Sequence, residues 1–154
     1  MKKICTIFLI LLFTQSCGYT PMYSKNQKVN FYIKSIEFTE SDKDLANYLK
    51  LNLNNYFEKK DGSEYIIDAN ISYKKKIASK DSTGEIEEYN LSSVAKFIIK
   101  SNNFSKTINI SESFKMENFS DEFQEKEYED NIKKNIARTM TSKLLFQLSR
   151  FDVN

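Results

Sequence analysis

Regularly spaced hydrophobic positions divide the chain after residue 28 into six predicted elements. Strands are predicted at about 29–38, 65–77, 86–100 and 106–117, where apolar side chains recur at every second position. Apolar steps of three and four residues predict a helix that opens at Ser41 and a long helix from about Ser120 to Ser149. The order β-α-β-β-β-α predicts an α+β fold: a two-layer sandwich with a four-stranded, mostly antiparallel sheet and two helices on one face.

The first strand and the first helix carry local signals. Apolar positions change parity between Ile33 and Ile36, so a bulge or a strand end is expected near Lys34. Ser41 precedes Asp44 by the three residues of a capping box, and Gly62 is predicted to follow the end of the helix as its C′ residue. Six residues form the predicted apolar stripe of this helix: Leu45, Tyr48, Leu49, Leu53, Tyr56 and Phe57.

The long second helix is predicted to pack through an apolar residue at every fourth position. That stripe comprises Tyr128, Ile132, Ile136, Met140, Leu144 and Leu148. Its first half is acidic and its second half is basic, the distribution that the helix dipole favours. Helix stability is therefore a sufficient explanation for the charge pattern at this stage.

Residues 1–16 have the organisation of an export signal. Lys2 and Lys3 form a positive segment, and Ile4 to Phe13 is an apolar run interrupted only by Thr6. A run of this length spans about 15 Å as a helix, roughly half the hydrocarbon core of a bilayer, so it does not predict a transmembrane anchor.

The signal ends at Thr14-Gln15-Ser16-Cys17, which resembles the bacterial lipobox. That resemblance implies cleavage after Ser16 and diacylglyceryl and N-acyl groups on Cys17, although Thr14 stands where the motif usually has Leu. The other interpretation is an ordinary secretory signal followed by a free thiol. We expect a signal peptide at 1–16, a lipidated tether at 17–28 and a folded domain at 29–154. The resemblance to bacterial lipoproteins, in which Asp after the cysteine favours retention in the inner membrane, implies that Gly18 directs the chain to the outer membrane, on the periplasmic side.

Composition excludes several classes of protein. The chain has 154 residues, no His and three Gly, so neither His-dependent catalysis nor a glycine-rich phosphate loop can be built. Lys2 and Lys3 supply the whole formal net charge of +2, since the rest of the chain has 21 basic and 21 acidic residues. We therefore expect no nucleic-acid partner, no metal and no non-covalent cofactor.

The segment Cys17-Gly18-Tyr19-Thr20-Pro21-Met22-Tyr23 resembles the C-G-[FYW]-x-P-[LM]-Y opening of the LptE family, lipoproteins of lipopolysaccharide assembly. The Glu88-Tyr89-Asn90-Leu91 segment and the order of the elements are also similar to that family, particularly its alphaproteobacterial members. The resemblance implies a protein without enzymatic activity and without catalytic residues. It implies a lipoprotein that plugs an LptD-type outer-membrane β-barrel, assists the assembly of that barrel and interacts with lipopolysaccharide.

A basic cluster is the candidate contact for lipopolysaccharide phosphates. It comprises Lys74, Lys75, Lys76 and Lys80, next to the predicted turn after the second strand. A solvated turn would explain these lysines equally well.

Two other functions remain open from the sequence. The chain could be an accessory lipoprotein of another envelope transporter or of a peptidoglycan-associated complex. It could also be a periplasmic hydrolase that uses paired carboxylates such as Asp68 and Glu112, although no motif surrounds either residue.

Overall fold

The computed structural model describes residues 30–58, 62–102 and 104–151. Within these ranges the chain forms six regular elements and one short 3₁₀ turn, in the predicted order. They are β1 (Phe31–Phe38), α2 (Lys43–Leu53), a 3₁₀ turn (Asn54–Tyr56), β2 (Ser63–Lys80), β3 (Ile86–Ser101), β4 (Phe104–Glu117) and α3 (Glu122–Phe151). The strands after α2 run longer than their alternation predicted.

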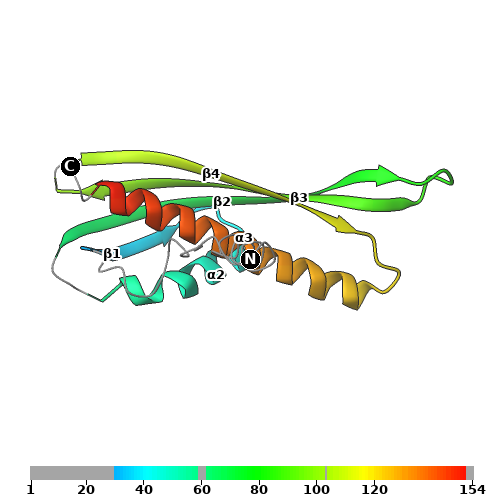
Figure 1. Cartoon of the computed structure of the whole chain (residues 1–154), viewed down its shortest axis with the longest axis horizontal. Coiled ribbons are helices and arrows are strands. Elements are labelled where there is room, and N and C mark those ends of the chain that lie inside the picture. The colour runs from blue at the N-terminus through cyan, green and yellow to red at the C-terminus, as the bar shows by residue number, and fades with distance from the viewer. Residues whose placement is uncertain (1–29, 59–61, 103, 152–154) are drawn as a thin grey trace, which may run out of the picture.

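The four strands form one mixed sheet in the order β1-β2-β3-β4. β1 runs parallel to β2, and the other two pairs are antiparallel. The register of β1 shifts between Ile33 and Ser35, which confirms the bulge predicted near Lys34. The hairpin of β2 and β3 extends to one end of the molecule, whereas β1 and the C-terminal end of α3 lie toward the other end (Figure 1).

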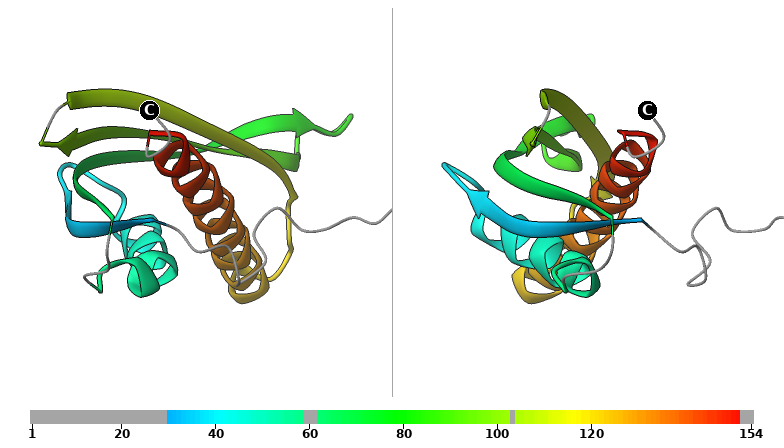
Figure 2. Two further views of the ribbon diagram at one scale, coloured as in Figure 1. Left: turned by 60° about the vertical axis from the view of Figure 1, so that its left-hand side comes forward. Right: turned by 90° about the vertical axis from the view of Figure 1, so that its left-hand side faces the viewer.

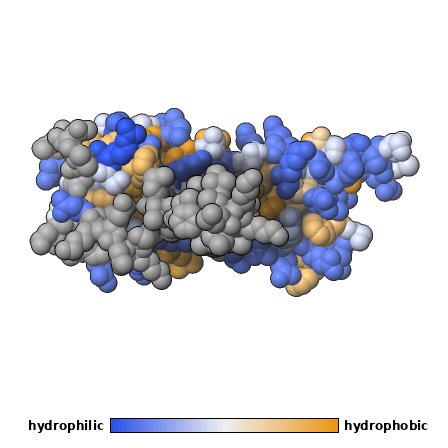
Figure 3. All heavy atoms as spheres, viewed as in Figure 1, coloured by the Kyte–Doolittle hydropathy of each residue, from blue (hydrophilic) through white to orange (hydrophobic). Residues whose placement is uncertain are grey.

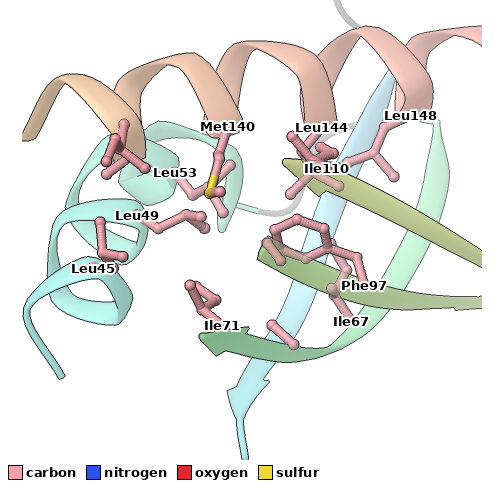
Figure 4. Packing of buried hydrophobic residues seen from close by; sticks show 14 of the residues in the cluster. Leu45, Leu49, Leu53, Ile67, Ile71, Phe97, Ile110, Met140, Leu144 and Leu148 are labelled. Atoms are coloured by element: carbon pink, nitrogen blue, oxygen red, sulfur yellow. The ribbon is translucent and has the colours of Figure 1, made fainter. Parts of the chain in front are cut away.

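Both helices pack on the same face of the sheet, as predicted. Figure 2 shows the sheet curling over α2 and α3, which leaves the opposite face without a helix. The core joins the inward residues of the strands to one stripe of each helix (Figure 4). Ile67, Ile71, Phe97, Leu49 and Leu144 are among the side chains with no exposed surface. Burial of such side chains stabilises the fold by roughly 1.5–3 kcal/mol each.

The N-terminal cap of α2 is Asp42, so the prediction that Ser41 opens the helix was wrong. The Asp42 carboxylate accepts a hydrogen bond from the amide of Leu45 at 3.0 Å. Ser41 instead continues the strand pairing of β2, because its Oγ accepts from the amide of Ile71 at 3.0 Å. Both residue types are good caps, and the sheet edge determines which of the two is available.

α2 also ends earlier than predicted, at Leu53. The 3₁₀ turn Asn54–Tyr56 follows and keeps the predicted Tyr56 and Phe57 packed against the core. Gly62 is not the C′ residue, because it lies directly before β2. Its φ is +130°, and a Cβ at this position would lie 1.9 Å from the carbonyl oxygen of Asn30. The glycine therefore allows β1 and β2 to approach where their pairing begins.

α3 has two unlike halves. Its buried residues begin at Ile132 and continue to Leu148. Tyr128, predicted to belong to the buried stripe, is 47% exposed, and Phe123 is 76% exposed. Among the described residues no helix combines the length and the apolar character needed to span a membrane.

Candidate functional site on the uncovered sheet face

The predicted lipidation site lies outside the described residues. Cys17, Ser16 and the tether to residue 28 belong to the segment that precedes residue 30. The candidate site described below therefore concerns the folded domain.

The sheet face opposite the helices is polar and rich in hydroxyl and amide groups. On β4, the outward positions from 105 to 113 are Ser105, Thr107, Asn109, Ser111 and Ser113, and all five are exposed. β2 and β3 contribute further serines and asparagines in register with them: Asn70, Ser72, Asn90 and Ser92. Within the described chain no helix covers this surface, which we call the outer face.

The four predicted lysines do not form one cluster. Lys74 and Lys76 are exposed on the outer face, because their register partners Ser92 and Asn90 lie there. Lys75 pairs with the fully buried Leu91 and therefore lies on the helix-covered face. Lys80 ends β2 at the hairpin turn and is exposed. Successive residues of a strand alternate between faces, so Lys75 lies on the opposite face from Lys74 and Lys76.

Lys75 joins the hairpin to α3. Its ammonium lies 2.6 Å from the carboxylate of Glu125 and 2.9 Å from that of Glu129, and 4.3 Å from the centre of the Tyr89 ring. Partial burial opposes the charge on Lys75, but the hydrogen bonds to the two carboxylates prevail and raise its pKa. The side chain is only 25% exposed. Lys75 therefore holds α3 against β2.

Further polar contacts extend this connection along α3 toward α2. Lys133 lies 2.8 Å from the carboxylate of Asp44, and the hydroxyl of Tyr73 donates to Glu129 at 2.7 Å. The hydroxyl of Tyr48 donates to Asp130, and this hydrogen bond raises the pKa of Tyr48 to about 12. Glu125, Glu129 and Asp130 of α3 thus have specific partners, beyond the dipole effect that the sequence suggested.

Burial opposes ionisation of Glu129, but the hydrogen bonds from Tyr73 and Lys75 outweigh it and lower its pKa. The carboxylate therefore stays charged while it holds the first half of α3 against β2. We call these contacts among β2, α2 and α3 the polar seam. Its members are Asp44, Tyr48, Tyr73, Lys75, Glu125, Glu129, Asp130 and Lys133.

Lys96 is a basic residue of the outer face that the sequence reasoning missed. It pairs with Asn70 on β2 and Asn109 on β4, and it is exposed. Its outward orientation could have been read from the sequence, because it lies between the inward residues Ala95 and Phe97. Lys96 borders a shallow hollow of about 380 Å³, which Thr39, Asp68, Asn70 and Ile98 also line.

Ion pairs occupy the two ends of the outer face. Asp68 accepts from Lys100 at 2.6 Å toward the β1 end, and Glu88 accepts from Lys115 at 3.0 Å toward the hairpin. Between these pairs, the outward positions of β2, β3 and β4 carry lysines and no carboxylate: the basic members are Lys74, Lys76 and Lys96. This basic band suits an anionic partner that also forms hydrogen bonds with hydroxyl and amide groups.

The carboxylates considered for hydrolysis lie on opposite faces of the sheet. Asp68 is on the outer face, whereas Glu112 pairs with the buried Ser93 and lies 2.6 Å from Lys143 of α3. They cannot flank one scissile bond, so this arrangement removes the support for a paired-carboxylate hydrolase. No group of three or more metal-binding side chains occurs among the described residues.

Solved structures share this architecture. Rare lipoprotein B from Shewanella oneidensis superposes with a TM-score of 0.62 at 16% identity, over 80% of this chain and 97% of that protein. The fold is that of known bacterial lipoproteins. An uncharacterized lipoprotein B from Nitrosomonas europaea gives a TM-score of 0.60 at 15% identity, covering 84% and 91% of the two chains. A minor lipoprotein from Acinetobacter baumannii gives 0.58 at 12% identity, covering 79% and 92%.

The similarity to these proteins is found in the structure and not in the sequence. No protein-family model matches the sequence, and no curated protein matches it. At these identities the superpositions establish a common fold.

Proposed function

We propose that this chain is an outer-membrane lipoprotein of the LptE type. Cleavage after Ser16 and acylation of Cys17 would anchor it in the membrane on the periplasmic side. The folded domain would plug an LptD-type β-barrel, assist the assembly of that barrel and take part in inserting lipopolysaccharide into the outer leaflet.

One observation carries this proposal: a chain with an LptE-like opening at Cys17–Tyr23 has the fold of bacterial lipoproteins over about four fifths of its length. The surface is compatible with the role. The interior of a transmembrane barrel is polar, and the outer face offers hydroxyl, amide and ammonium groups in a regular array.

The basic band, together with Lys80 at the end of β2, is the proposed contact for lipopolysaccharide phosphates. Lys74, Lys76 and Lys96 are exposed on one face and lie among hydrogen-bonding side chains. Lys75, the fourth lysine of the predicted cluster, would act indirectly by holding α3 beneath the hairpin.

Affinity purification tests the barrel partner. A tagged full-length chain recovered from detergent-solubilised outer membranes should bring down a large β-barrel protein in stoichiometric amount. Recovery of an inner-membrane complex would instead support the accessory-lipoprotein alternative. Recovery without any barrel protein would contradict the plug proposal.

The two cysteines provide a matched test of the anchor. Metabolic labelling with a radioactive fatty acid should label the wild-type chain and the Cys5→Ser variant, because Cys5 leaves with the signal peptide. The Cys17→Ser variant should incorporate no label and should remain unprocessed. Equal labelling of Cys17→Ser and wild type would exclude Cys17 as the acylated residue.

A further inference from the structure

The two edges of the sheet differ in how they are protected. β1 has eight residues, is interrupted by the bulge at Lys34 and bears an exposed charge there, and these are features that discourage pairing with another strand. β4 has fourteen residues, and its pairing with β3 shows no register shift from Phe104 to Glu117. Within the described chain no strand pairs with the second edge of β4.

The unpaired backbone groups of β4 belong to its odd-numbered residues. The amide of Asn118 donates to the carbonyl of Glu87, which lies directly opposite it, so even-numbered positions bond to β3. The N–H and C=O groups of Ser105, Thr107, Asn109, Ser111 and Ser113 therefore point to the unpaired edge. All five residues are exposed and have small polar side chains, which leave the backbone accessible.

Two charged residues on the other face of β4 would ordinarily discourage pairing. Lys106 lies over the ring of Phe151 at 4.4 Å, and Glu112 binds Lys143. They stand six positions apart on one strand, about 20 Å, and cannot reach each other within one chain. Their opposite signs become important when β4 meets an antiparallel copy of itself.

We infer that β4 is a self-association edge, which pairs antiparallel with β4 of a second copy around a two-fold axis at Asn109. In this register Lys106 lies opposite Glu112 of the second copy, and the symmetry repeats the pair. The remaining cross-strand pairs are also matched in kind: Phe104 with Phe114, Ile108 with Ile110, Ser105 with Ser113, Thr107 with Ser111, and Asn109 with its own equivalent.

Neighbouring registers lose this match. A slip of two residues in one direction places Lys106 opposite Phe114 and Glu112 opposite Ile108, and a slip in the other direction places Lys106 opposite Ile110. A slip of one residue would bring outer-face side chains opposite core side chains. The Asn109 register forms about ten backbone hydrogen bonds between the odd-numbered residues and joins two four-stranded sheets into one.

Cysteine cross-linking tests both the dimer and its register. In the full-length chain, Asn109→Cys places two thiols across the two-fold axis with Cα atoms about 5.5 Å apart, within disulfide range. Oxidation should convert Asn109→Cys to a covalent dimer. Ser105→Cys and Ser113→Cys should each form no covalent dimer alone, and the two should cross-link to each other when they are mixed. The unsubstituted chain controls for linkage through Cys5 or Cys17.

A proline variant separates association from folding. Asn109→Pro removes an amide that points to the unpaired edge and leaves the hydrogen bonds to β3 intact. The wild-type chain should sediment as a concentration-dependent dimer, and Asn109→Pro should sediment as a folded monomer with an unchanged circular dichroism spectrum. The inference is overturned by a wild-type monomer at every concentration up to the solubility limit, or by cross-links of Asn109→Cys only to a different protein. It does not depend on the proposed function, since a dimer that fails to form leaves the barrel test unaffected.

Discussion

The ammonium of Lys75 on β2 lies 2.9 Å from the carboxylate of Glu129 on α3, 54 residues further along the chain. Glu125, one turn earlier on the same helix, binds the same ammonium at 2.6 Å. No residue between Glu122 and Asn131 is buried, so the first third of α3 is held mainly by these polar contacts, with a ring contact between Tyr128 and Phe119.

Replacing Lys75 should therefore destabilise the protein. Lys75→Met leaves two partly buried carboxylates without their cation, and we expect the free energy of unfolding to fall by about 1–3 kcal/mol. Lys76→Met is the matched control, because Lys76 is exposed on the outer face, and its effect should stay within about 0.5 kcal/mol. Urea denaturation followed by circular dichroism measures both. Equal effects would show that the contacts of Lys75 with Glu125 and Glu129 contribute nothing to stability.

Most of the fold followed from hydrophobic spacing. Alternation predicted all four strands, the bulge at Lys34 and the inward residues, because a strand with one covered face must place apolar side chains at every second position. The local details at the ends of α2 did not follow. Ser41 and Asp42 are both competent caps, and only the pairing of Ser41 with Ile71 of β2, a contact distant in sequence, decides between them.

The candidate site was predicted less well, for a related reason. The sequence run suggests one cluster of lysines, but neighbours in a strand face opposite ways, and Lys75 therefore lies on the other face from Lys74 and Lys76. Lys96 was missed because it is distant in sequence from Lys74 and shares a face with it only through strand pairing. The i,i+4 spacing of Glu125 and Glu129 indicated a shared helix face, but not which cation meets it.

The stabilisation that the polar seam gives to the protein should be lost at alkaline pH. The hydrogen bond to Asp130 raises the pKa of Tyr48 from its ordinary 10.0 to about 12. The folded state therefore retains the phenolic proton over a range in which the unfolded state releases it. Stability should be intact below about pH 10 and should fall as the pH rises toward 12. Equilibrium unfolding at a series of pH values measures this slope.

The contribution of Tyr48 can be separated from that of the lysines. Lys75 and Lys133 also have raised pKa values, because hydrogen bonds to their carboxylate partners outweigh their partial burial. Their stabilisation is lost in the same alkaline range. Tyr48→Phe should therefore reduce the slope without abolishing it. A wild-type slope in Tyr48→Phe would contradict this assignment.

Lipopolysaccharide binding should depend on the basic band. Changing Lys74, Lys76 and Lys96 together to Ser should weaken binding of purified lipopolysaccharide by about tenfold or more, since each charge-assisted contact contributes on the order of 1 kcal/mol. Lys100→Ser is the control for a lysine of the same face that is already paired, with Asp68. Isothermal titration at two salt concentrations measures the affinities. Unchanged binding by the triple variant would exclude the basic band as the lipopolysaccharide contact.

Two glycines with positive φ distinguish a close approach from backbone strain. Gly62→Ala would place a Cβ 1.9 Å from the carbonyl oxygen of Asn30, so the start of β1 must move away from β2. We expect a loss of stability of about 3 kcal/mol or more. Gly84→Ala retains the unfavourable φ of +89° but meets no atom within 4 Å, so its loss should be only about 1–2 kcal/mol. Thermal and urea unfolding of the two variants give the comparison. Similar losses would show that the conformation of Gly62, and not its contact with Asn30, is what the fold requires.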